Sequence, residues 1–463
     1  MSIHTQIQAV QNGAATWRQS SVKDRLKGLR KLRQTLITNE NEILQAFAKD
    51  YKKPPVEVLL TEIEPVVAEI DFVLTHLRSW VRPQRAVGGL FFWGSTGEIR
   101  HQPKGAVLII SPWNFPLNLA LAPLVSALAC GNTVLLKPSE LTPHVSHWIQ
   151  KTVAEIFPPD QVQVVQGGPE ITQLLLQERF AHIFFTGSTR VGQLVLQAAS
   201  QHLTPVTLEL GGKSPTVITA SANLSLSAEK VLWGKIMNSG QTCVAPDHVY
   251  VHASVVDEWL RIYRALIDKL QNATGTTQSF AQIITPKHAE RLHAMVETSP
   301  NSNRSMGPHI LDLTNDDFRQ AWSTYGQLTA LREEIFGPVL PVFKYSHENE
   351  LIAWLQSQET PLAFYLFSDN RKIFESFCQA VPAGTAAWND LIIQFAHKGL
   401  PFGGRGASGM GNCHGLAGLR TFSHEQGVVL QGWGGKLLTF FFPPYQDWQL
   451  KILRFYLRYF RGI

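Results

Sequence analysis

Cys243 is the residue whose sequence neighbours best suit a nucleophile. It lies in the segment Asn-Ser-Gly-Gln-Thr-Cys-Val-Ala-Pro, residues 238–246, just past a predicted helix and among small polar residues that leave a sulfur accessible. A thiolate readily attacks carbonyl carbons, although a lone cysteine is more often a small buried hydrophobic residue. We assign that second role to Cys130, which lies in an apolar helix, and to Cys378 and Cys413, which have no neighbouring motif.

Two turns could bind a nucleotide. Residues 184–192, Phe-Phe-Thr-Gly-Ser-Thr-Arg-Val-Gly, lead from a predicted strand into a helix, whose free N–H groups and dipole attract a pyrophosphate. Residues 135–140 follow the neighbouring strand, and nucleotides bind at strand ends in open sheets. There Lys137 and Glu140 could hydrogen-bond ribose hydroxyls; the alternative for either alone is an exposed ion pair.

Two further glycine motifs are discounted. Residues 404–409 fit GxGxxG, but they follow a loop instead of a buried strand. Residues 212–214 resemble the end of a P-loop, but Thr207 replaces the upstream glycine that the motif needs. Neither segment predicts nucleotide binding.

Size and composition limit the class of protein. The 463 residues exceed what one hydrophobic core usually serves, so at least two domains are expected. The net charge of +5 is too small to predict nucleic-acid binding. The four cysteines lack metal-ligand or disulfide spacing, so we predict no metal site and expect a reducing cytosol. The sequence shows neither a secretory signal nor an uncharged apolar run of about 18 residues, the length of a membrane span.

Periodicity predicts the elements that must position these residues. Residues 21–80 are helical, with Leu26, Leu29, Leu32 and Leu36 on one face. Residues 83–100 are predicted to form a hairpin or an excursion between domains. From 105 to 200, and again from 215 to about 420, β-branched runs alternate with helical patterns, which predicts doubly wound α/β sheets. Thr142 is expected to cap a helix that follows it. The irregular region 272–331 is left unassigned.

Six motifs occur in the order found in aldehyde dehydrogenases, and the chain resembles that family over nearly its whole length. They are SPWNFP at 111–116, FTGS at 185–188, ELGGK at 209–213, GQTC at 240–243, EEIFGP at 333–338 and PFGG at 401–404. The class 3, fatty-aldehyde branch is the most similar. The resemblance implies a Rossmann-like NAD-binding domain and an α/β catalytic domain. The expected bounds are 1–81 and 107–209 for the NAD-binding domain, 210–420 for the catalytic domain, 82–106 and 421–440 for a bridging and oligomerisation element, and 441–463 for an amphipathic tail.

The resemblance also implies a role for each motif. Cys243 would attack the aldehyde, and Asn114 with the Cys243 N–H would hold the oxyanion, each donor being worth roughly 3 to 4 kcal/mol. Glu209 would activate the water that hydrolyses the thioester, which favours a free acid over acyl transfer to coenzyme A. The expected cofactor residues are Trp113, Lys137, Glu140, Gly187, Ser188, Glu334 and Phe336. Because Glu140 should repel a 2′-phosphate, NAD is ranked above NADP, although class 3 members accept both.

The tail carries a second signal. Lys451, Arg454, Arg458 and Arg461 share one helical face, and aromatic and aliphatic residues occupy the rest, which is typical of a helix in a membrane interface. The alternative is a helix that packs within an oligomer. We expect a homodimeric cytoplasmic enzyme, associated with membranes through this tail, that oxidises medium- or long-chain aldehydes. The alternatives are a detoxifier of short-chain or aromatic aldehydes and a non-catalytic structural protein of the same fold.

Overall fold

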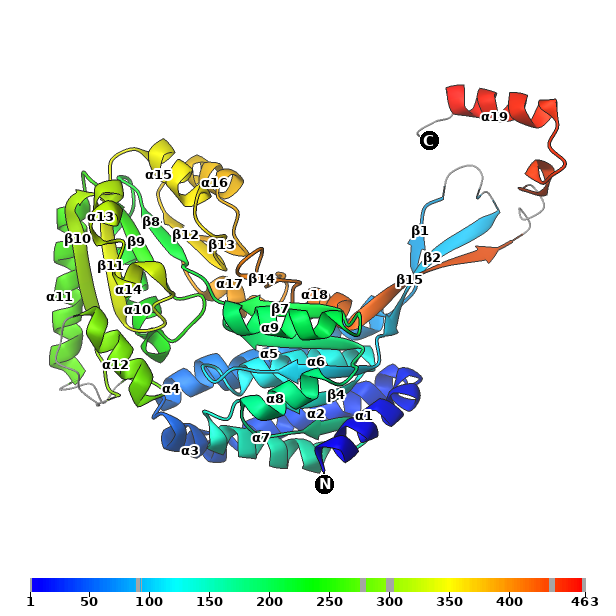
Figure 1. Cartoon of the computed structure of the whole chain (residues 1–463), viewed down its shortest axis with the longest axis horizontal. Coiled ribbons are helices and arrows are strands. Elements are labelled where there is room, and N and C mark those ends of the chain that lie inside the picture. The colour runs from blue at the N-terminus through cyan, green and yellow to red at the C-terminus, as the bar shows by residue number, and fades with distance from the viewer. Residues whose placement is uncertain are drawn as a thin grey trace.

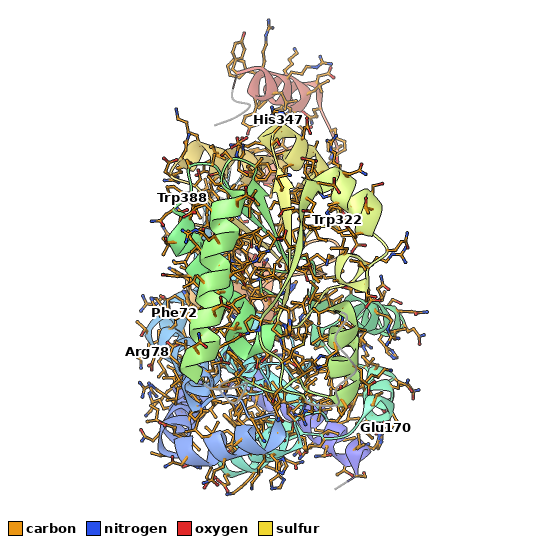
Figure 2. All side chains as sticks on the ribbon, turned by 90° about the vertical axis from the view of Figure 1, so that its left-hand side faces the viewer. Phe72, Arg78, Glu170, Trp322, His347 and Trp388 are labelled. Carbon is orange, nitrogen blue, oxygen red and sulfur yellow. The ribbon has the colours of Figure 1, made fainter. Side chains whose placement is uncertain are left out.

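The computed structural model describes residues 2–88, 92, 94–274, 280–296, 304–432 and 438–459. Helices flank two six-stranded sheets, and a three-stranded antiparallel sheet projects from them as an arm (Figure 1). The arm leads to α19 (Asp447–Tyr459), which stands apart from both larger sheets. Turned by 90°, Figure 2 places Trp322 and Trp388 in the upper unit and Glu170 in the lower one.

The helices predicted at 21–80 are present. They are α2 (Val22–Thr38), α3 (Glu40–Asp50), α4 (Pro55–Val58), the π-helical turn η1 (Leu59–Ile63) and α5 (Glu64–Trp80). They follow α1 (Ile3–Arg18), which sequence patterns did not predict. The four leucines predicted to share the apolar face of α2 are all buried. Glu62, on the π turn, is also buried, and π turns are frequent at functional sites.

The first large sheet has the strand order β14-β7-β6-β3-β4-β5. Its elements in chain order are β3 (Ala106–Ile110), α6 (Asn118–Cys130), β4 (Thr133–Lys137), α7 (Pro143–Ile156), β5 (Val162–Val164), α8 (Pro169–Leu176), β6 (His182–Gly187), α9 (Thr189–Ser200) and β7 (Val206–Leu210). The strands from β3 to β7 pair in parallel, as the alternation of strands and helices predicts.

Thr142 holds the predicted N-cap position of α7, with Pro143 in the first turn. Among the described residues, however, the Thr142 side chain makes no cap hydrogen bond, and Asp50 from the end of α3 accepts from the backbone N–H groups of His144 and Val145 instead, at 3.1 and 3.0 Å. A carboxylate offers two acceptor oxygens and favours the positive end of the helix dipole. The helix α7 is therefore tied to α3.

The second large sheet is parallel throughout, in the order β10-β11-β9-β8-β12-β13. Its elements are β8 (Pro215–Ile218), α10 (Leu224–Ile236), the 3-10 turn η3 (Met237–Gly240), β9 (His248–His252), α11 (Val256–Thr274), α12 (Pro286–Met295), β10 (His309–Asp317), α13 (Phe318–Tyr325), α14 (Thr329–Arg332), β11 (Val339–Tyr345), α15 (Glu348–Gln356), β12 (Ala363–Phe367), α16 (Arg371–Ala380), β13 (Thr385–Trp388) and α17 (Ile393–Ala396). The edge strand β10 lies in the region that sequence patterns left unassigned.

A short strand connects the second half of the chain to the first sheet. β14 (Gly409–Met410) pairs antiparallel with β7, opposite Glu209 and Leu208. A Cβ at Gly409, whose φ is +139°, would collide with the Leu208 carbonyl oxygen, so only glycine permits this approach. The sequence assigned β14 to the catalytic domain, but the strand pairs with β7 of the NAD-binding domain.

The arm contains β1 (Gln84–Ala86), β2 (Ser95–Pro103) and β15 (Ser423–Gln431), all antiparallel. The pairing of β1 with β2 confirms the hairpin predicted at 83–100. The helix α18 (Gly415–Phe422) precedes β15, and the turn η6 (Leu438–Phe441) precedes α19. We propose the domain division stated above with β14 and α18 moved to the NAD-binding domain; the three separate sheets support it.

Candidate active site

Cys243 sits on a tight turn between η3 and β9. Asn238 and Ser239, inside η3, lead into this turn and have φ values of +52° and +53°. The Tyr365 hydroxyl donates to the Val244 carbonyl at 2.7 Å. The thiol is half-buried, and the backbone N–H groups of Cys243 and Val244 lie close to its sulfur. These two N–H groups can also stabilise an oxyanion formed next to the sulfur.

Burial raises the pKa of the Cys243 thiol above its ordinary value, and the carboxylates of Glu334 and Glu209 raise it further. The two backbone N–H groups oppose this shift. Because the reactive species is the thiolate, the thiol needs a proton acceptor before it can attack.

Asn114 is fixed from both sides. Its side-chain amide donates to the Gln241 carbonyl at 3.1 Å. Its own backbone carbonyl accepts from the Tyr51 hydroxyl at 3.1 Å and from the Asn238 amide at 2.8 Å. An amide nitrogen carries two hydrogens, so one remains for an oxyanion.

A buried ion pair supports the Asn114 loop. Lys53 Nζ lies 2.6 Å from Glu62 Oε1, and both side chains have zero exposure. The ammonium also lies 4.1 Å from the Phe115 ring centroid. The second oxygen of Glu62 accepts from the backbone N–H groups of Leu117 and Asn118, at 3.2 and 3.1 Å, where α6 begins. The pair thereby fixes the residues that directly follow Asn114.

Glu209 lies on β7 and is buried. The Thr186 hydroxyl donates to Oε2 at 3.4 Å, and the thiol of Cys413 hydrogen-bonds the carboxylate. Among the described residues, Oε1 has no hydrogen-bond partner. Burial raises the pKa of Glu209 to about 7, against the opposing effect of the two hydrogen bonds. A carboxylate with this pKa can accept and return protons near neutral pH.

The carboxyl edge of the first sheet holds the other predicted cofactor residues. Lys137 ends β4, and its ammonium lies 2.7 Å from the Glu140 carboxylate. Gly187 ends β6, and the Ser188 hydroxyl caps α9 by accepting from the Val191 N–H at 3.4 Å. In parallel sheets, dinucleotides bind at this edge and place the pyrophosphate at a helix start.

Glu334 faces the Gly211–Gly212 turn that follows β7. The Gly212 N–H hydrogen-bonds its carboxylate, and a Cβ at Gly211 would collide with it. Burial, helped by the charge of Asp247, raises the pKa of Glu334 to about 8. The Phe336 and Trp113 rings lie 5.4 Å apart, nearly perpendicular.

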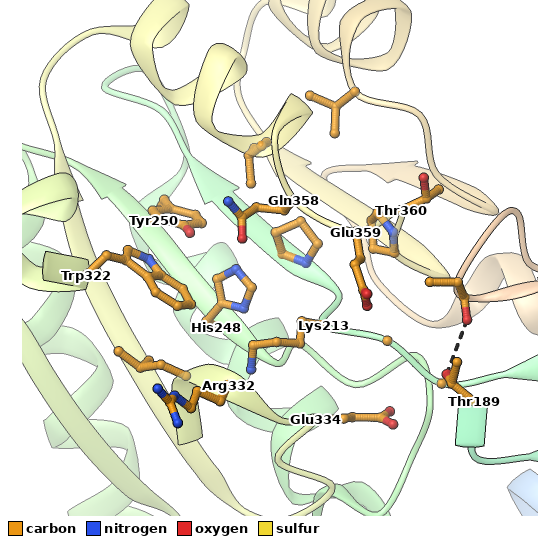
Figure 3. Close-up of a pocket in the computed structure, with 18 residues that line it drawn as sticks. Thr189, Lys213, His248, Tyr250, Trp322, Arg332, Glu334, Gln358, Glu359 and Thr360 are labelled. Carbon is orange, nitrogen blue, oxygen red and sulfur yellow. Dashed lines mark hydrogen bonds between the residues drawn. The ribbon is translucent and has the colours of Figure 1, made fainter. Parts of the chain in front are cut away.

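Lys213 and Asp247 hold the loop that carries Glu334. Their charged groups lie 2.5 Å apart, Lys213 also donates to the Glu333 carbonyl at 2.9 Å, and Asp247 accepts from the Ile335 N–H at 2.9 Å. Figure 3 shows Lys213 and Glu334 projecting into a cavity of about 370 Å³. The cavity extends to Thr189 at the start of α9, so it connects the two large sheets.

Comparison with known proteins identifies the family of this chain. A model described as the aldehyde dehydrogenase family matches residues 1–428. The chain belongs to that family. This aldehyde dehydrogenase is 36% identical over 430 residues to the 4,4′-diaponeurosporen-aldehyde dehydrogenase of Staphylococcus aureus. The alignment covers 90% of this chain and 91% of that relative. Over 465 residues it is 34% identical to aldehyde dehydrogenase family 3 member A2 of Rattus norvegicus, covering 98% and 93%.

A solved structure agrees with these sequence matches. It is described as the substrate-bound state of Staphylococcus aureus AldH, and it superposes with a TM-score of 0.90 at 33% identity, covering 99% of this chain and 100% of that one. The predicted fold, the resemblance to class 3 members and the enzyme class are therefore confirmed. The aldehyde dehydrogenase uses NAD or NADP.

The aldehyde dehydrogenase brings most of its predicted site residues together. Cys243 interacts electrostatically with Glu209 and Glu334, and Gln241 connects its turn to Asn114. The Lys137–Glu140 pair lies further from Glu209 along the sheet edge, at the end of β4, because β6 and β3 separate β4 from β7. Sequence reasoning missed the supporting residues, which are Tyr51, Lys53, Glu62, Thr186, Asn238, Asp247 and Cys413. Of these, Thr186 lies inside the quoted FTGS motif, Asn238 begins the quoted segment 238–246 and Asp247 follows it, whereas the other four lie outside the quoted motifs.

Proposed function

We propose that this aldehyde dehydrogenase oxidises medium- to long-chain aldehydes to carboxylic acids, with Cys243 as the nucleophile and Glu209 as the general base. One observation carries the proposal. A thiol surrounded by oxyanion donors lies within electrostatic range of a buried carboxylate whose pKa is about 7 and whose Oε1 lacks a partner among the described residues.

In the first step, Glu209 accepts the proton of the Cys243 thiol. The sulfur attacks the aldehyde carbon, a C–S bond forms, and the carbonyl π electrons move to oxygen. The oxyanion of this thiohemiacetal accepts hydrogen bonds from the Asn114 amide and the Cys243 N–H. Donors fixed before the reaction stabilise this charge without reorganising.

The cofactor residues fit a dinucleotide along the sheet edge. NAD(P)⁺, when bound, supplies the acceptor for the hydrogen that leaves the aldehyde carbon with its electron pair. Lys137 and Glu140 would hold the adenosine ribose, and Gly187 and Ser188 the pyrophosphate. Trp113, Glu334 and Phe336 would surround the nicotinamide end. Glu140 would repel a 2′-phosphate, so we propose that NAD is preferred.

Glu209 releases the thiol proton to solvent and, in the second step, takes a proton from a water molecule. The water oxygen attacks the thioester carbon, the C–S bond breaks, and the acid leaves while Glu209 returns this proton to the Cys243 thiolate. Glu209 Oε1, which has no hydrogen-bond partner in the described part of the chain, is suited to accept from water. This base supports release of a free acid instead of acyl transfer.

Apolar side chains around α10, the helix that precedes the Cys243 turn, support a lipophilic substrate. Gly234 on α10 packs against Leu391, Ile392 and Pro246, and Pro246 lies three residues after Cys243 in the sequence. The same helix lines an apolar groove of about 280 Å³ together with α11, and it exposes Trp233 there. A long hydrocarbon chain would bury surface against such residues. Short aldehydes would gain less from these contacts.

The tail supports contact with a membrane surface. In α19, Lys451, Arg454 and Arg458 recur at helical spacing, whereas Arg461 lies outside the described residues. Trp448, Ile452, Phe455, Leu457 and Tyr459 are exposed on the same helix. No helix in the described part of the chain combines the length and apolarity needed to cross a bilayer. We propose a homodimer whose tails lie in the membrane interface.

A substrate panel tests the activity. We expect kcat/KM to rise with aldehyde chain length, NAD to be preferred over NADP, and Cys243→Ala to be inactive. Highest efficiency with short or aromatic aldehydes would assign the detoxifying role, and activity in Cys243→Ala would refute the nucleophile. If no aldehyde yields NADH, the structural-protein alternative holds.

Truncation after Phe440 tests the tail separately. We expect binding to vesicles of phosphatidylcholine and phosphatidylserine to fall, together with activity on long-chain aldehydes. Activity on short aldehydes should persist. The matched variant Lys451→Gln/Arg454→Gln keeps the helix and should weaken binding to the anionic vesicles alone. Unchanged vesicle binding after truncation would instead support packing of the tail within the oligomer.

A further inference from the structure

Cys413 contacts the proposed general base, although its sequence neighbourhood predicted only a structural role. It is buried, and its thiol hydrogen-bonds the Glu209 carboxylate. The two residues are far apart in sequence, so the contact depends on how the chain returns to the first sheet.

The backbone brings Cys413 to this position in two ways. β14 pairs Gly409 opposite Glu209 in an antiparallel register. Four residues later, the Cys413 N–H donates to the Phe402 carbonyl at 2.7 Å, and the Phe402 N–H donates back to the Cys413 carbonyl at 3.2 Å. This two-way bridge fixes the backbone that carries the thiol, so the contact with Glu209 is built into the fold.

The charged groups around the thiol keep it protonated. Burial raises the pKa of Cys413 well above its ordinary value, and the carboxylates of Glu209 and Glu69 add to this, whereas the ammonium of Lys398 opposes it. The neighbouring His414 is buried, stacked on Phe402, and its pKa is well below its ordinary value. Cys413 therefore remains an S–H donor at neutral pH.

A thiol is a weaker hydrogen-bond donor than a hydroxyl. A weak donor orients the carboxylate but stabilises its ionised form only slightly. A stronger donor would lower the pKa of Glu209 and reduce its basicity. A side chain without a donor would remove the hydrogen bond that opposes burial, so the pKa of Glu209 would rise. The position thus combines orientation of the base with a pKa near neutrality.

We propose that Cys413 is a positioning residue for Glu209, which orients the carboxylate and sets the pH range in which the thioester is hydrolysed. The inference rests on the proposed role of Glu209 as the base. It concerns the residue that controls this base, and it assigns Cys413 no covalent step.

The test measures decay of the acyl group on Cys243 across pH 5.5–9. The full-length enzyme is mixed with NAD and a limiting amount of one aldehyde, quenched at intervals, and the acylated protein is quantified by mass. For wild type, the decay rate should rise with pH and level off above a midpoint.

Three variants at one position should move the midpoint in opposite directions. Cys413→Ser supplies a stronger donor and should lower the midpoint by about half a pH unit. Cys413→Val fills the site without a donor and should raise it by a similar amount, and Cys413→Ala should also raise it. Cys130→Ser is the matched control, because Cys130 is equally buried but donates to the Leu419 carbonyl instead, and its midpoint should equal that of wild type.

The possible failures are distinguishable. If Glu209→Gln leaves acyl decay unchanged, the proposed base is wrong. If Glu209→Gln slows decay but the Cys413 variants keep the wild-type midpoint, the inference about Cys413 is overturned alone. A purely structural role predicts that all three Cys413 variants lower the rate without moving the midpoint. Since serine is close to cysteine in size, its midpoint remains measurable even if valine or alanine impairs folding.

Discussion

Asn114 contacts the turn that carries the nucleophile, Glu209 interacts electrostatically with its thiol, and the protein holds these two residues differently. Three hydrogen bonds fix Asn114, with the Lys53–Glu62 pair behind it. Glu209 receives a long hydrogen bond from Thr186 and a weak one from Cys413, and its Oε1 has no partner among the described residues.

The difference follows the chemistry proposed for each residue. An oxyanion donor works best when its position is fixed before charge develops, because reorganisation then costs nothing. A base must exchange protons with a thiol and then with water, so full hydrogen bonding would hinder it. Weak donors leave the carboxylate its basicity. The contrast can be tested by removing the residues that hold Asn114 and by changing the hydrogen-bond donors to Glu209.

The largest effect should come from breaking the buried ion pair. Lys53→Met leaves Glu62 charged and uncompensated inside the protein, which costs about 3–5 kcal/mol of unfolding free energy. Urea denaturation measures the loss. Arg371→Ala is the control, because its ion pair with Glu375 is exposed and contributes about 0.3–0.5 kcal/mol. Equal losses in both variants would contradict a special role for the buried pair.

The second largest effect should come from removing the oxyanion donor. Asn114→Ala should slow formation of the acyl group on Cys243 by about 10²–10³-fold, the usual cost of losing one such donor. Rapid-quench measurement of the acylated protein gives this rate, and unchanged NAD affinity would show that the cofactor site is intact. A loss below about threefold would mean that the backbone N–H groups suffice.

Sequence patterns predicted the elements and motif residues because their signals are local. The four leucines of α2 recur at helical spacing, and the strands from β3 to β7 show as β-branched runs. Contacts across the chain leave no such signal. Tyr51 meets Asn114 across 63 residues, and Asp50, instead of the Thr142 side chain, accepts from the first N–H groups of α7. Cys413 looked structural because nothing near it in sequence indicates that β14 pairs beside Glu209.

A smaller loss should follow when one support of Asn114 is removed. Tyr51→Phe deletes only the hydroxyl that donates to the Asn114 carbonyl, and a hydrogen bond of this kind contributes about 0.5–1.5 kcal/mol. Acylation should slow by a few-fold, whereas acyl decay should keep its pH midpoint. Tyr263→Phe, another buried tyrosine outside the site, is the control for loss of a hydroxyl. A shifted midpoint in Tyr51→Phe would show that the two regions are coupled.

The smallest effect should come from Thr186→Val on the Glu209 side. The hydroxyl lowers the pKa of Glu209, which burial has raised to about 7, so its loss should move the midpoint of acyl decay upward. The base must be ionised to accept a proton, so decay should slow at pH 6.5 and stay unchanged at pH 8.5. At 3.4 Å the bond is long, and a shift smaller than that of Cys413→Val is expected. If Thr186→Val instead gave the larger shift, the hydroxyl and not the thiol would be the main control on the base.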